Sequence, residues 1–200
     1  MLTLETVLSR DYEVWAVCPD RQRSGTSQAI SLRETLRMNE VQPRHYQVSG
    51  FPVDCVNLAL HSGMFPAFDL VVSGINHGYN VGDDVHYSGT VGAARHACIH
   101  GYRAIAISCG IYDIHADFSH VAEWFGGWLK ENLHRLKAGS VYNINYPEMP
   151  GPDLEVRFTR HGKRVYKDDY EMLEEEAGKS FVFKLKETIM GHKEEELTDF

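Results

Sequence analysis

Short apolar runs alternate with amphipathic stretches along most of this chain, and that alternation limits its fold more than any other feature. The apolar runs have the length of buried strands, and the stretches between them carry apolar residues at helical spacing. Strand and helix in regular alternation build a mainly parallel sheet covered by helices. We therefore predict an α/β protein with a Rossmann-like three-layer fold. The runs at 14–18, 69–73 and 103–109 should lie in one largely parallel sheet.

The same pattern gives the individual elements. Strands are expected at residues 14–18, 45–48, 69–73, 103–109, 141–145, 154–159 and 181–185. Helices are expected at 2–9, 53–60, 88–100 and 117–136. We interpret the acidic stretch 168–176 as a solvated face or loop. Because 200 residues can bury one sizeable core and no repeat or clear linker interrupts them, we expect a single domain, 1–200.

Charge and cysteine usage exclude several classes of partner. The formal net charge is −8, whereas nucleic-acid backbones are held by clustered Lys and Arg, so we expect no long nucleic acid as a partner. The cysteines at 18, 55, 98 and 109 form no CxxC pair and have apolar neighbours, which predicts reduced core thiols in a cytoplasmic protein. No apolar run approaches the roughly 20 residues of a membrane span, so no membrane partner is expected.

Two loops follow strands at the expected carboxyl edge of the sheet, where parallel α/β sheets bind their ligands. The second loop, 73–84, contains three glycines that let backbone amides approach a small anionic ligand. Its Asn76 and Asn80 offer amide oxygens suited to a hard cation or a phosphate, or they simply make turns. Ser88-Gly89-Thr90 then opens a helix, and it either caps that helix or presents its amides to a phosphate.

The first loop, 18–27, places charged and hydroxyl side chains close together. Arg21 and Arg23 can clamp a phosphate, and the hydroxyl of Ser24 can ligate a divalent cation. Alternatively, Asp20 pairs with the arginines in an ordinary turn. The residues of this loop by themselves favour the turn.

Histidine spacing raises a separate possibility. His96 and His100 lie at i and i+4 on one expected helix, a spacing used by zinc sites. The glutamate that a metalloprotease motif needs at position 97 is Ala97, so we interpret these residues as surface or partly buried histidines. His77, inside the second loop, either touches substrate or fills space. No strand is followed by Gly-x-Gly-x-x-Gly, which disfavours an NAD-binding oxidoreductase.

Several segments resemble one known family. Residues 19–27 resemble the Pro-Asp-Arg-x-x-Ser-Gly segment of the SurE (survival protein) nucleotidases. The longest signature of that family is similar to residues 69–76, 80–84 and 87–91. Weaker similarity is present at 50–55, 143–147, 159–160 with Gly162, and 198–200.

The resemblance implies a divalent-metal-dependent hydrolase, a 5'/3'-nucleotidase that releases phosphate from nucleoside monophosphates. Ser24 and Asn76 match the family's metal-ligating serine and asparagine, and the metal would be Mg²⁺ or Mn²⁺. Asn80 and Ser88-Gly89-Thr90 match positions near the substrate phosphate. The resemblance assigns no catalytic side chain in this sequence, and it implies homodimers or homotetramers.

One part of the family pattern is missing. The family's other two metal ligands are adjacent aspartates in an Asn-Asp-Asp-Gly turn near its first strand, and this sequence has no such turn; Asp83-Asp84 matches a different position. We expect the first strand and its turn to lie upstream of Met1, so that residues 1–200 form a domain truncated at both ends. The alternative is a non-catalytic nucleotide-binding or oligomerisation module.

Overall fold

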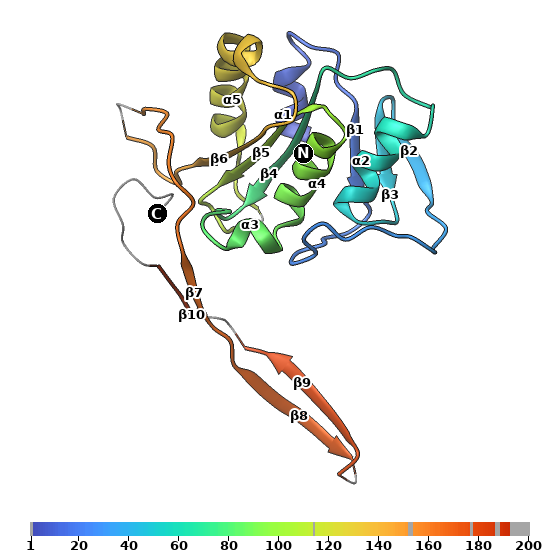
Figure 1. The fold of residues 1–200 in the computed structure, drawn as a ribbon, viewed down its shortest axis with the longest axis vertical. Coiled ribbons are helices and arrows are strands. Elements are labelled where there is room, and N and C mark those ends of the chain that lie inside the picture. Colours follow the sequence, from blue (N-terminus) through green and yellow to red (C-terminus); the bar gives the residue numbers. More distant parts are fainter. Residues whose placement is uncertain (1, 114, 152–153, 177, 187–188, 193–200) are drawn as a thin grey trace. The chain divides into compact units, whose positions relative to one another are not determined.

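The computed structural model describes residues 2–113, 115–151, 154–176, 178–186 and 189–192 (Figure 1). The weak family similarity at 198–200 lies outside these residues. The helices are α1 (Leu2–Leu8), α2 (Pro52–His61), α3 (Asp84–Tyr87), α4 (Gly89–Ile99) and α5 (Ser119–Asn132), the last followed by a 3₁₀ turn, Leu133–Arg135. The strands are β1 (Ala16–Pro19), β2 (Met38–Gln42), β3 (His45–Val48), β4 (Leu70–His77), β5 (Arg103–Cys109), β6 (Val141–Tyr146), β7 (Arg164–Lys167), β8 (Tyr170–Glu176), β9 (Ser180–Leu185) and β10 (Ile189–His192).

Contacts divide the chain into two compact units. The first contains residues 1–80 and 84–155, and the second contains 81–83 and 156–200. Whether they form a single domain stays a prediction. Throughout the described ranges, each helix is too short or too polar to cross a lipid bilayer.

The first unit has the predicted α/β architecture with mainly parallel strands. One set of strands has the order β4-β5-β6 and is parallel throughout. A second set has the order β1-β3-β2, in which β1 is parallel to β3 and β2 is antiparallel to it. Figure 1 shows these two groups of strands with their helices. The α/β class is therefore confirmed.

The prediction of one continuous sheet is wrong. Segment 14–18 contributes to β1, which belongs to a different hydrogen-bonded sheet from β4 and β5. The physical reason is that β1 and β4 are both edge strands and face a common cavity instead of pairing. Apolar patterning predicts which side chains become buried, but it does not show which backbone edge has a partner.

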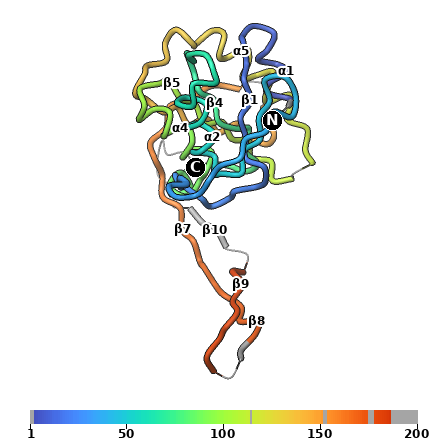
Figure 2. The backbone as a smooth tube through the Cα atoms, turned by 90° about the vertical axis from the view of Figure 1, so that its right-hand side faces the viewer, coloured from blue at the N-terminus to red at the C-terminus, as the bar shows by residue number. Residues whose placement is uncertain are grey.

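Helices cover both faces of β4-β5-β6. Successive residues of β5 point to opposite sides of the sheet, and because they are apolar on both sides, each side packs against helices. Ile105 and Ile107 face α1 and α5, and the resulting cluster includes the fully buried Phe125. Ala104 and Ala106 face α4 on the other side. Figures 1 and 2 both show α1 next to α5, in agreement with their contacts.

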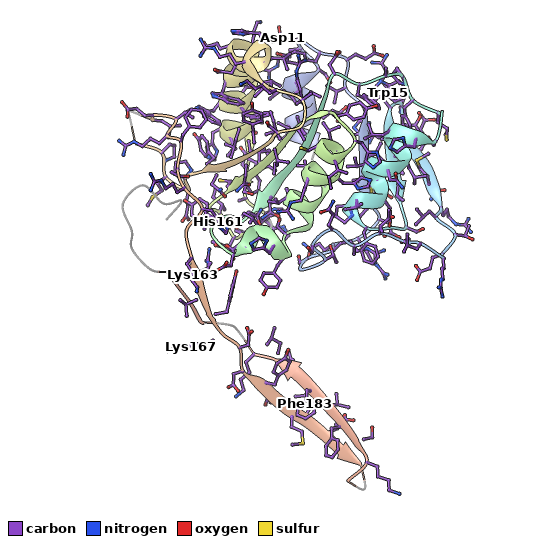
Figure 3. The ribbon with its side chains drawn as sticks, in the orientation of Figure 1. Asp11, Trp15, His161, Lys163, Lys167 and Phe183 are labelled. Carbon is purple, nitrogen blue, oxygen red and sulfur yellow. The ribbon has the colours of Figure 1, made fainter. Side chains whose placement is uncertain are left out.

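The second unit consists of two antiparallel strand pairs, β7 with β10 and β8 with β9. The Phe181 and Phe183 rings on β9 stack with centroids 6.4 Å apart, and Figure 3 labels Phe183 on this hairpin. Our interpretation of 168–176 as a solvated face or loop is correct in that residues 168–174 are exposed. It is wrong about the loop, because most of the stretch forms β8. Its acidic side chains are compatible with an exposed hairpin strand whose backbone is paired with β9.

The strand expected at 154–159 is also wrong. That segment takes no regular structure, and residues 155–160 are exposed. Its apolar alternation resembles that of a half-buried strand, but exposed side chains gain no burial energy to hold them extended. The other expected strands and helices are present with small shifts in their ends.

Candidate functional site

The two edge strands β1 and β4 line a cavity of about 800 Å³, which we call the slot. Residues of α1, α2, α4 and α5 also contribute to its walls. The slot leaves β4 half-buried from Leu70 to Asn76, whereas β5 is buried from Ala104 to Cys109. The slot walls include Pro19, the last residue of β1, and Asn76, close to the end of β4. The carboxyl ends of both strands therefore contribute to it.

Asn76 has its side-chain amide held in a fixed direction. Its Nδ2 donates to the carbonyl oxygens of His77 and Gly78, each at 2.9 Å. Its Oδ1 accepts a hydrogen bond from the Thr90 hydroxyl at 3.2 Å. A carbonyl oxygen has two lone pairs, so Oδ1 retains one that a cation can use. Asn76 and Thr90 both line the slot.

The backbone at the end of β4 depends on Gly74. Its φ is +137°, and a Cβ built there would lie 2.3 Å from the carbonyl oxygen of Ile107. A side chain is therefore excluded on both conformational and steric grounds. This close approach to β5 sets the path of the chain into Asn76.

Helix α4 begins beside Asn76 in the way its sequence predicts. The Ser88 hydroxyl accepts a hydrogen bond from the Val91 amide at 3.2 Å, so Ser88 is the N-cap residue of the helix. Gly89 and Thr90 are the first two residues of α4, and amides at those positions have no acceptor within their own helix. They remain suited to an anion at the positive end of the helix.

The first loop packs against this helix start. The Ser27 amide donates to the carbonyl of Tyr87 at 2.8 Å, and the Ser27 hydroxyl donates to that of His86 at 2.6 Å. A Cβ built on Gly89 would lie 3.0 Å from the Thr26 hydroxyl oxygen. The loop that contains Ser24 is thus held on the α4 start, and Thr90 of that start contacts Asn76.

Within the first loop, Arg23 has a structural role. It pairs with Asp20 at 3.4 Å and donates to the Ser49 carbonyl at 2.8 Å, and its guanidinium lies over the Phe51 ring. The turn interpretation of this loop therefore describes Arg23 correctly. Ser24 itself is exposed, and its role as a metal ligand stays a prediction.

Asn80 is buried and ties the second loop to two strands. Its Nδ2 donates to the Ser108 hydroxyl at 2.7 Å, and its backbone amide donates to Asn145 Oδ1 at 2.8 Å. Its carbonyl accepts from the side chains of Asn143 and Asn145. Ser108, Asn143 and Asn145 were not predicted from the sequence as supports for this loop. The weak family similarity at 143–147 covers the two asparagines, and no sequence signal covers Ser108. The phosphate-binding role of Asn80 stays a prediction.

Other reactive side chains near the slot are poorly suited to catalysis. Cys18 and Cys55 line it, and burial raises the pKa of both thiols. A protonated thiol is a weak nucleophile, so neither cysteine is a candidate catalyst. His77 is exposed, and its ring meets that of Phe118 edge-on with centroids 4.8 Å apart. Among the side chains described in this subsection, the slot therefore offers the fixed oxygen of Asn76, with Thr90 at the start of α4 beside it.

Comparison with known proteins gives consistent matches. A family model described as survival protein SurE matches residues 1–168. A protein named 5'-nucleotidase SurE from Leptospira interrogans is 43% identical over 198 residues, covering 98% of this chain and 79% of that protein. One of the same name from Leptospira biflexa is 40% identical over 200 residues, covering 98% and 81%. The crystal structure of the SurE protein from Aquifex aeolicus superposes with a TM-score of 0.78 at 30% identity, covering 99% and 81%.

Proposed function

The chain belongs to the SurE family, and we propose on that basis that it is a 5'-nucleotidase that uses a divalent metal ion to hydrolyse nucleoside monophosphates. The names of its close relatives support the activity. The observation that carries the proposal within this chain is the fixed Asn76 amide beside the start of α4. The alternative of a non-catalytic module gains no support from any of these relatives.

The donor atoms at this position suit a hard cation. Mg²⁺ and Mn²⁺ prefer oxygen ligands, and we assign Asn76 Oδ1 and the Ser24 hydroxyl as two of them. When bound, such an ion neutralises charge on the phosphoryl group. Magnesium sites usually also include one or two carboxylates. We therefore propose that carboxylates must be added to these two neutral ligands.

The slot supplies a place for those carboxylates. A strand inserted between β1 and β4, parallel to both, would pair with two exposed backbone edges and end beside Pro19 and Asn76. An Asn-Asp-Asp-Gly turn at that end would project its aspartates at the carboxyl edge of the sheet. Helix α1, which precedes β1 and packs on α5, would then be the crossover of a strand–helix–strand unit.

The residues of this chain position the substrate. The amides of Gly89 and Thr90, at the positive end of α4, can hold the phosphate. Thr90 also holds Asn76 Oδ1 in place. The Asn80 network keeps the loop between β4 and α3 anchored to β5 and β6. The phosphate is therefore bound and oriented by backbone and side-chain amides, and the added carboxylates supply the negative charge that holds the metal ion.

The central experiment compares two lengths of the protein. One is this 200-residue chain, and the other carries an N-terminal extension with an apolar strand and an Asn-Asp-Asp-Gly turn. Phosphate release from a nucleoside monophosphate is measured with Mg²⁺ or Mn²⁺ and with a chelator. We expect metal-dependent release from the extended protein and little from the shorter one. Equal activity from both lengths, or activity indifferent to the chelator, would refute the proposed machinery.

A matched pair of variants tests Asn76. In the extended protein, Asn76→Ala should weaken metal binding and activity together by at least about tenfold, because even indirect supports of a metal site are worth that much. Asn39→Ala removes the same side chain at an exposed position of β2 and should change neither. An Asn76 variant that keeps wild-type metal affinity would remove Asn76 from the site.

We also propose an oligomeric state and a cellular location. A homodimer or homotetramer is supported by apolar side chains exposed on the β8–β9 hairpin, among them Phe181 and Phe183. A cytoplasmic location is supported by the four free cysteines. Light scattering of the wild type and of Phe183→Ser tests the first, since loss of the aromatic patch should lower the mass if the hairpin forms the interface.

A further inference from the structure

Three histidine rings meet where α2 and α4 end. His61 is the last residue of α2, His96 lies in the last turn of α4, and His100 is the C-cap residue of α4. The Nε2 atom of His61 lies 3.1 Å from Nδ1 of His100. The ring centroid of His100 is 4.5 Å from that of His61 and 4.6 Å from that of His96. The sequence shows only the i, i+4 pair, since His61 comes from another helix.

We propose that His61, His96 and His100 form a binding site for a borderline transition-metal ion of the Zn²⁺ class. Imidazole nitrogen is a preferred ligand of such ions. Two nitrogens bound to one tetrahedral zinc ion at about 2.0–2.1 Å lie about 3.3 Å apart. The observed separation of 3.1 Å between His61 and His100 is close to that value. For these two residues, binding requires that each ring turn a nitrogen lone pair toward the ion, in place of the N–H that they now share.

His96 completes the set from one helical turn before His100. Its Nε2 is buried and has no hydrogen-bond partner among the described residues. Burial, followed by the neighbouring His100 and His61, lowers the pKa of His96. The three rings form a chain with His100 in the middle, so ligation by all three requires the His96 side chain to turn toward the ion that His61 and His100 share.

This site is separate from the proposed nucleotidase centre. Ten residues of helix, about 15 Å, separate His100 from Thr90 at the other end of α4. The ligand chemistry also differs, because imidazoles select borderline ions whereas the oxygens of Ser24 and Asn76 select hard ones. A metal ion held by both helices would join the end of α2 to the end of α4.

Titration of the full chain with Zn²⁺ alone tests the proposal. Calorimetry should give one ion per chain, and His61→Ala, His96→Ala and His100→Ala should each weaken binding by at least about tenfold, because loss of a ligand exceeds the loss of an outer support. His134→Ala is the matched control, since His134 is exposed in the 3₁₀ turn after α5. It should bind Zn²⁺ like the wild type. Thermal unfolding without metal checks that each variant is folded.

Two further measurements distinguish this site from zinc binding elsewhere on the chain. Zinc at about a hundredfold excess over its Kd should raise Tm by roughly 5–10 °C in the wild type and not in His100→Ala. The near-ultraviolet and visible spectrum of bound Co²⁺ should show nitrogen ligation without the near-ultraviolet thiolate charge-transfer band that a cysteine would give. Absence of binding, equal affinity in the His100 and His134 variants, or a thiolate band would overturn the site. Unchanged affinity in His96→Ala would overturn the three-ligand set.

Discussion

Replacing Gly92 by alanine tests how the first loop is held on α4. A Cβ built on Gly92 would lie 2.2 Å from the carbonyl oxygen of Ser27 and 2.8 Å from its carbon. Ser27 cannot easily retreat, because its amide and hydroxyl are both bonded to backbone carbonyls around α3. The added methyl group must therefore push the loop off the helix or distort the helix itself.

The size of the effect follows from two opposing contributions. Alanine in place of glycine in a helix gains about 1 kcal/mol of propensity. Overpacking costs about 1–3 kcal/mol, and a clash with anchored backbone lies at the upper end of that range. We expect a net loss of about 2 kcal/mol for Gly92→Ala. Gly127→Ala in α5 is the control, because a Cβ there meets nothing within 4 Å, and it should gain up to about 1 kcal/mol.

Urea denaturation followed by circular dichroism measures both variants. The free energies of unfolding should differ by about 3 kcal/mol, which corresponds to roughly 6–12 °C in Tm for a chain of this size. Because Ser24 lies in the displaced loop, the folded Gly92 variant should also bind Mg²⁺ or Mn²⁺ more weakly in the extended protein. A Gly92 variant as stable as the Gly127 variant would refute the described packing of loop on helix.

Three other substitutions have defined outcomes. Asp54→Ala removes a buried carboxylate that accepts bonds from the Ser31 amide and hydroxyl, and it should lower the free energy of unfolding in urea by about 3 kcal/mol or more. Ser108→Ala leaves the Asn80 amide without its buried acceptor and should cost about 1–3 kcal/mol by the same assay. Hydrogen bonds from Ser119 lower the pKa of Asp117 below its ordinary value of 3.8. The contribution of Asp117 to folding stability is therefore complete above pH 3.8 and is lost as the pH falls through the folded-state pKa. In an acid titration of unfolding, Asp117→Asn should lack this loss.

The sequence predicted those parts of the fold in which apolar pattern and burial coincide. The run at 103–109 is β5, and it is apolar because it is buried between helices on both faces. β2 was missed because its residues are exposed or half-buried and give no alternation. Its pairing with β3 depends on a tight turn in which Arg44 has a positive φ, a feature that leaves little trace in composition.

The site was predictable to the extent that it follows from topology. Asn76 and Thr90 come together because a parallel strand and the helix after it meet at the carboxyl edge. Contacts between distant segments were not predictable in this way. Nothing local in the chain indicates that Asn145 holds Asn80 or that His61 meets His100, because those pairings depend on how strands and helices pack.

The slot also affects how the first unit moves. Within the described residues, no strand of β1-β3-β2 is paired with a strand of β4-β5-β6, and α2 bridges the two groups through its contacts with β1 and α4. Side-chain packing between the two groups can loosen without breaking a backbone hydrogen bond within either sheet. The group of shorter strands, β1-β3-β2, can therefore move away while β4-β5-β6 stays intact. Amide hydrogen exchange should therefore be faster in β1 and β3 than in β5, and the unit should behave as two cooperative blocks.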